Sequence, residues 1–117
     1  MGKINIADVD TLLNRSELRP TARSGGIPLF DFSDSERLLK LCERLRIGVL
    51  GIEGFTLSNG DLRPDMDYIG DFSSLLGRSD FEEESVRSAW KFLQLAAGVP
   101  QLLFEYVLVN GNASLTG

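Results

Sequence analysis

The chain has 117 residues, 43% of them hydrophobic and 25% charged, which is the size and composition of one globular domain. It contains no histidine, so Ser-His-Asp and Cys-His catalytic systems are excluded, and zinc, copper and non-haem iron sites lose their commonest ligand. Its one cysteine, Cys42, excludes an intramolecular disulfide. No apolar run reaches the roughly 20 residues that span a bilayer, and the first residues lack the apolar core of a signal peptide. We therefore expect a cytoplasmic protein without a membrane segment.

The first third of the chain combines short apolar segments with a polar loop. Apolar residues at helical spacing predict a short helix over 8–14. Prolines, glycines and a lack of periodicity predict a loop over 15–28. The three arginines of this loop favour a solvated basic segment over an RNA contact. The apolar run 27–32 predicts a short strand.

A longer helix is expected next. Ser33 and Glu36 have the spacing of a capping box, which predicts that the helix begins at Ser33. The apolar stripe of this helix is formed by Leu38, Leu39, Leu41, Cys42 and Leu45. Because Cys42 lies among leucines in mid-helix, we expect it to pack and not to react. Residues 46–55 then predict a strand, whose glycines indicate a bulge or a close backbone approach.

The Asn59-Gly60 pair predicts a hairpin turn after that strand. Pro64 lacks a backbone donor, which restricts the returning segment to a sheet edge or a loop.

The last third predicts one helix and one strand. Capping boxes at Ser79 with Glu82, and at Asp80 with Glu83, predict the start of a helix that ends before Gly98. Its apolar face is formed by Val86, Ala89, Trp90, Leu93, Ala96 and Ala97. The apolar run 102–109 predicts a strand.

This order of elements predicts an α+β fold, in which a small antiparallel or mixed sheet packs against two to three helices. We expect a single domain over 1–109 and a flexible tail over 110–117.

The negative charge is concentrated in the middle of the chain. Residues 47–85 contain nine acidic and two basic residues, a net charge of −7, although the whole chain carries −5. A field of one sign attracts a basic partner and repels phosphate backbones. We therefore expect a protein partner with a basic surface and no direct contact with nucleic acid.

Carboxylates and apolar anchors alternate in this region, a mixture that suits a protein interface. The predicted partner-binding residues are Glu53, Phe55, Asp61, Asp65, Met66, Asp67, Tyr68 and Asp71. Their spacing does not match a calcium loop, so no metal or cofactor is expected. Glu53 and Glu105 each stand inside a predicted strand, and if the strands are neighbours the two glutamates meet on one face. The alternative interpretation is that this segment is a polar loop whose apolar residues pack into the core.

The runs VLGIEGF and RPDMDYIGDFSSL, followed by a capped helix and FEYVL, resemble the small immunity proteins of bacterial polymorphic toxin and contact-dependent inhibition systems. The resemblance covers about residues 47–109. It implies a non-enzymatic inhibitor that binds a cognate toxin, often a nuclease, and occludes the toxin's basic surface.

Two other functions fit the same residues. One is a different acidic protein-binding regulator or nucleic-acid mimic, which the identity of its partner distinguishes from an immunity protein. The other is a small carboxylate-dependent hydrolase, which requires a concave pocket that encloses two carboxylates with raised pKa values. The sequence does not define the oligomeric state.

Overall fold

The computed structural model describes residues 6–110. Its elements are β1 (Ile6–Ala7), α1 (Val9–Asn14), β2 (Ala22–Ser24), β3 (Ile27–Leu29), α2 (Phe32–Leu45), β4 (Gly48–Ser58), β5 (Asp61–Asp71), the 3-10 turn η1 (Ser73–Leu75), α3 (Phe81–Leu95) and β6 (Leu102–Val109). Of the tail predicted over 110–117, residues 111–117 lie outside the described residues. No helix within 6–110 is long and apolar enough to cross a membrane.

The main sheet has four strands in the order β1-β6-β4-β5, and all of its pairs are antiparallel. A separate hairpin, β2-β3, adjoins the β6 side of the sheet through backbone hydrogen bonds between Phe30 and Phe104. Helices and an antiparallel sheet in one fold confirm the predicted α+β class.

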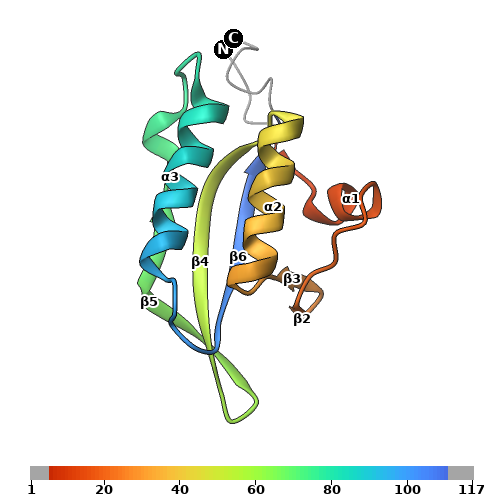
Figure 1. Ribbon diagram of the computed structural model, residues 1–117, viewed down its shortest axis with the longest axis vertical. Coiled ribbons are helices and arrows are strands. Elements are labelled where there is room, and N and C mark those ends of the chain that lie inside the picture. Colours follow the sequence, from red (N-terminus) through yellow and green to blue (C-terminus); the bar gives the residue numbers. More distant parts are fainter. Residues whose placement is uncertain (1–5, 111–117) are drawn as a thin grey trace.

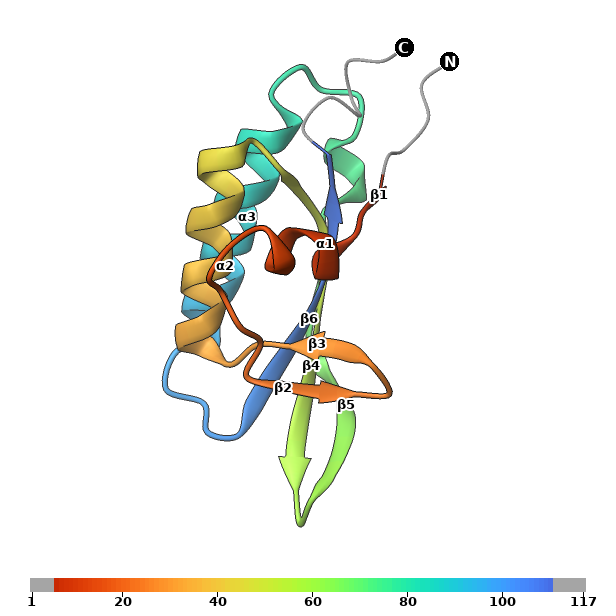
Figure 2. The same ribbon diagram turned by 90° about the vertical axis from the view of Figure 1, so that its right-hand side faces the viewer.

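Helices α2 and α3 lie side by side on one face of the sheet, as Figures 1 and 2 show. Alternate residues of the strands point into the core between these layers, among them Ile52, Phe104, Tyr106 and Leu108. At one end of the sheet, Leu75 and Leu76 from η1 pack with Leu50, Phe81 and Val109 in a second, smaller cluster.

The β4-β5 hairpin forms as the sequence predicts. Asn59 and Gly60 have φ values of 52° and 82°, and two consecutive positive values are the requirement of a type I′ turn. Pro64 lies in β5, which is an edge strand, as expected for a residue without a backbone donor.

None of the three predicted capping boxes forms among the described residues. Helix α2 begins one residue before Ser33, and its cap is Asp31, whose carboxylate accepts a hydrogen bond of 2.8 Å from the backbone N–H of Asp34. At the start of α3, Asp80 makes no capping hydrogen bond, because its two carboxylate oxygens accept from Arg78 instead. A side chain that is bound to a neighbouring cation is not available to the helix end.

The predicted loop over 15–28 contains β2, which the sequence pattern did not indicate, whereas its partner β3 lies within the strand predicted over 27–32. Each of these strands has only three residues, too few to show an alternating pattern. The expected apolar stripes are buried except at three positions: Trp90 is partly buried, Leu45 at the end of α2 is 48% exposed, and Ala97, just beyond α3, is exposed. Cys42 is fully buried, as expected.

Candidate functional site: the open face of the sheet

Two glutamates stand directly opposite each other on the central strands. Glu53 of β4 is the register partner of Glu105 of β6, so the prediction that they meet is confirmed. Burial, and next the negative charge of Glu53, raises the pKa of Glu105 above its ordinary value. No ion pair within residues 6–110 involves either glutamate. The pair therefore holds two like charges side by side without a cation from the chain itself.

Strand alternation places these glutamates on the sheet face opposite α2 and α3. Their neighbours Ile52 and Phe104 point into the core, so Glu53 and Glu105 point away from the helices. In Figure 2 the sheet is seen nearly edge-on, and α2 and α3 lie together on one side of it.

Apolar side chains flank the glutamate pair on the same face. Ile69 of β5 is the register partner of Glu53 and is 45% exposed. Val107 lies two residues beyond Glu105 and is 38% exposed. We call the six residues that share this part of the sheet the open-face patch: Glu53, Phe55, Ile69, Asp71, Glu105 and Val107.

Asp71 is the third carboxylate of the patch. It is opposite Gly51, which in turn is opposite Val107, so the three residues form a second row next to the glutamate row. Hydrogen bonds from the side chain and the backbone N–H of Ser73 lower the pKa of Asp71. Its charge is therefore retained under mildly acidic conditions.

The other predicted residues lie elsewhere on the hairpin. The register shifts between Glu53 and Phe55, and β5 passes through an extra stretch of residues there. We call this stretch, Asp65–Tyr68, the bulge segment. Asp65 accepts hydrogen bonds from the Thr56 hydroxyl at 2.9 Å and from the Asp67 backbone N–H at 3.1 Å.

These two hydrogen bonds turn the chain outward at the bulge segment. Met66 is 76% exposed and Asp67 is also exposed. Asp61 is exposed beside the turn at the tip of the hairpin. Asp61, Asp67 and Met66 are thus displayed on a projection and not on the open-face patch.

Tyr68 points to the helix side of the sheet. It packs against the main core, and a Cβ atom added at Gly54 would lie 2.7 Å from the Cβ of Tyr68. The glycine in β4 therefore marks a close approach, as the sequence predicts. Tyr68 supports β5 from the core side and presents little of its ring to a partner on the open face.

The structure thus divides the eight predicted residues. It brings Glu53, Phe55 and Asp71 together on the open-face patch, places Asp61, Asp65, Met66 and Asp67 on the projecting hairpin, and turns Tyr68 toward the core. Sequence reasoning did not include Glu105, Ile69 and Val107 in the site. The strand register brings them to it by joining residues that are distant in the sequence.

The cations of residues 6–110 form no ion pair with the predicted carboxylates. The ion pairs between described residues join Arg23 to Asp10, Arg37 to Asp34, Arg78 to Asp80 and Arg87 to Glu84. None of them involves the open-face patch or the bulge segment. Among residues 6–110 there is also no group of His, Cys, Asp and Glu residues arranged to hold a metal ion.

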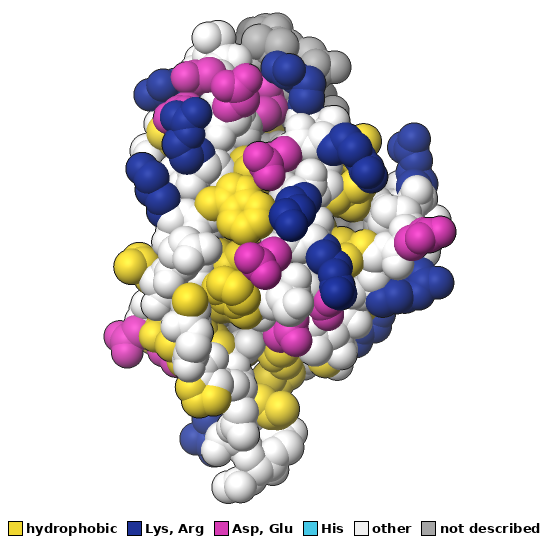
Figure 3. Space-filling view, in the orientation of Figure 1, with side chains coloured by type: hydrophobic (Ala, Val, Ile, Leu, Met, Phe, Trp, Pro, Cys, Tyr) yellow, Lys and Arg dark blue, Asp and Glu magenta, His cyan; other side chains and the backbone are white. Residues whose placement is uncertain are grey.

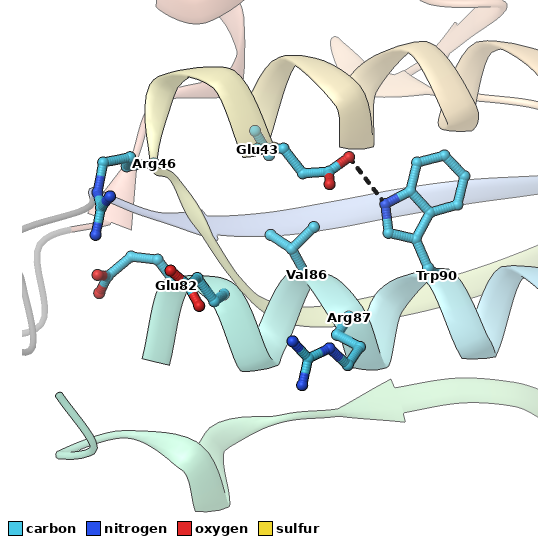
Figure 4. Close-up of a pocket in the computed structure, with 8 residues that line it drawn as sticks. Glu43, Arg46, Glu82, Val86, Arg87 and Trp90 are labelled. Atoms are coloured by element: carbon cyan, nitrogen blue, oxygen red, sulfur yellow. Dashed lines mark hydrogen bonds between the residues drawn. The ribbon is translucent and has the colours of Figure 1, made fainter. Parts of the chain in front are cut away.

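A hollow of about 390 Å³ lies between α2 and α3, on the opposite side of the molecule from the open-face patch. In Figure 4 the indole of Trp90 lies across it from Glu43, whose carboxylate accepts a hydrogen bond of 3.2 Å from the Trp90 Nε1–H. Arg46, Glu82 and Arg87 also line the hollow. The hollow is therefore lined by side chains of both charges.

No protein-family model, curated protein or solved structure matches the chain. The function is therefore argued from the arrangement of the residues themselves.

Proposed function

We propose that this protein is an immunity-type inhibitor, which binds a protein toxin with a basic surface and blocks that surface. The observation that carries the proposal is the Glu53–Glu105 pair, which no cation of residues 6–110 neutralises, on a sheet face that also exposes Ile69 and Val107. Opposed like charges destabilise a sheet, and a cation supplied by a partner relieves that repulsion.

The chemistry of the open-face patch defines the contact that a toxin would make. A lysine or arginine placed between Glu53 and Glu105 would form charge-assisted hydrogen bonds with both carboxylates. Phe55, Ile69 and Val107 would exclude water around that contact, as the apolar ring around a hot spot does. Close charge pairs across an interface couple by about 1.5–7 kcal/mol, so these two glutamates would dominate the affinity.

The carboxylates on the projecting hairpin would act at the margin of the interface. Asp61, Asp65 and Asp67 are not paired with a cation among the described residues, and Met66 offers an exposed apolar contact beside them. Charges at an interface margin mainly raise the rate of association. A toxin that binds nucleic acid carries the positive field to which these residues would respond.

The proposal is tested by affinity capture from the native cell followed by growth rescue. The wild-type chain should retain a protein with a basic surface, and co-expression of the chain should restore the growth of cells that produce that protein. The E53K/E105K variant should fail in both assays, while E17K/E83K, with the same change in charge at two exposed glutamates outside the patch, should behave as wild type. Equal capture and rescue by both variants would refute the proposed surface.

A further inference from the structure

A second charged surface lies on the other side of the molecule and has no role in the proposed function. Two adjoining hollows, of about 860 and 510 Å³, run along α2 beside the segment that follows α1, and share Ser16, Leu41 and Arg44. Their basic residues, which we call the basic strip, are Arg15, Arg19, Arg37, Lys40 and Arg44. Figure 3 shows dark-blue side chains gathered over this side of the molecule, across α2 and α1.

Most of the charge of the basic strip is not neutralised by the chain itself. Among the described residues, only Arg37 of the strip is in an ion pair, with Asp34. Glu17 is the other acidic residue that lines the larger hollow. Lys40 and Arg44 are four residues apart on α2, so they present their charges on the same helix face.

The floor of the larger hollow is apolar. Leu18, Pro20 and Leu41 line it between the cations. Its occupant must therefore bring a small number of negative charges together with an apolar group. A phosphate backbone brings charge without such an apolar group.

The projecting end of the β4-β5 hairpin has the complementary chemistry. We call residues 56–67 the acidic arm. It carries Asp61, Asp65 and Asp67 against Arg63, and it displays the exposed Met66. In Figure 1 the arm extends beyond the body of the molecule and away from α2, so it does not reach the basic strip of its own chain.

We propose that the acidic arm of one copy docks in the basic strip of a second copy. Met66 would rest on the apolar floor formed by Leu18, Pro20 and Leu41, and Asp61 and Asp67 would pair with Arg19, Lys40 and Arg44. Because the two surfaces differ, the contact is head-to-tail, and it either closes into a ring, of which a reciprocal dimer is the smallest, or continues as an open chain.

The test needs only the purified chain, so its result is independent of the proposed toxin. Sedimentation velocity over a concentration series should show wild-type species larger than a monomer, and these should dissociate in about 1 M salt, where the Debye length is about 3 Å. The variants K40Q/R44Q and D61N/D67N should each be monomeric, with association weakened about tenfold or more. R87Q/K91Q, the same pair of residue types four positions apart on α3, is the matched control and should associate as wild type.

A mixture of the two monomeric variants gives the sharpest result. K40Q/R44Q retains the acidic arm but not the basic strip, and D61N/D67N retains the basic strip but not the acidic arm. Together they should form a one-to-one dimer and nothing larger. The inference is overturned if wild type is monomeric at every concentration, if the two variants associate as strongly as the control, or if their mixture remains monomeric. Association that disappears on nuclease treatment would also overturn it, because the strip would then hold nucleic acid.

Discussion

Glu53 and Glu105 are register partners on the two central strands, and they face away from the helices that cover the sheet. Neither carboxylate is paired with a cation from the described part of the chain. Like charges in directly opposed positions weaken a sheet. A protein that carries such a pair loses some stability there, and the binding function that we propose for this position would account for the loss.

Removal of one charge from the pair is expected to stabilise the free protein. The raised pKa of Glu105 means that the folded state holds its proton more tightly than the unfolded state. The destabilisation is therefore complete above the raised pKa and disappears as the pH falls below the ordinary carboxyl value. At pH 7, E105Q should increase the free energy of unfolding by about 0.5 kcal/mol, and the gain should disappear near pH 4, as measured by urea denaturation.

E17Q is the control for that measurement, because Glu17 lies in an exposed segment outside the sheet. It should leave the free energy of unfolding unchanged at both pH values. A gain for E105Q that is equal at pH 7 and pH 4 would show that repulsion between the two charges is not its cause.

Truncation of Tyr68 should destabilise the protein clearly, whereas truncation of Met66, two residues away on β5, should have little effect on stability. Tyr68 packs against the core, so Y68A should reduce the free energy of unfolding by about 2–3 kcal/mol. Met66 is mostly exposed, so M66A should change it by less than about 0.5 kcal/mol. Thermal and urea unfolding of the two variants provide the comparison, and similar values for both would contradict the orientation of the bulge segment.

Substitutions at the start of α2 test which residue caps this helix. Asp31 accepts the hydrogen bond from Asp34, so D31A should cost about 1 kcal/mol of stability. S33A should cost less than about 0.5 kcal/mol, because Ser33 lies inside the helix. If S33A is the more destabilising of the two, the helix begins where the capping-box pattern placed it.

Cys42 should be inert in the folded protein. Burial, together with the charge of Glu43, raises the pKa of its thiol to about 12, so almost no thiolate exists at pH 8. A disulfide reagent should therefore fail to label the native chain and should label it fully in denaturant. Rapid labelling under native conditions would mean that α2 opens locally.

The elements with long regular patterns could be predicted from the sequence, and the contacts between distant residues could not. The strand over 102–109 and the Asn59-Gly60 turn have the predicted positions, because apolar composition and turn chemistry act locally. The prediction of the α3 cap was wrong for a local reason as well. Asp80 could accept hydrogen bonds either from the helix N-terminus or from Arg78, and the sequence does not show that it binds Arg78.

The candidate site depends on register and on bulges. A shift of one residue in the pairing of a strand moves each side chain to the opposite face. The bulge segment changes the alternation of β5, which is why Tyr68 faces the core although the alternation of charges around it suggested an exposed interface. Glu105, Ile69 and Val107 join Glu53 only through pairing across three strands, and the sequence pattern alone does not fix that pairing.

The most direct test of the account is the dissociation constant of the captured partner for three purified chains, measured by calorimetry at neutral pH: wild type, E53Q/E105Q and the control E17Q/E83Q. If the partner places a cation between Glu53 and Glu105, E53Q/E105Q should bind about a hundredfold more weakly, a loss of about 2.7 kcal/mol, while the control binds as wild type. Equal affinity of E53Q/E105Q and wild type would contradict the claim that the open-face patch is the binding surface.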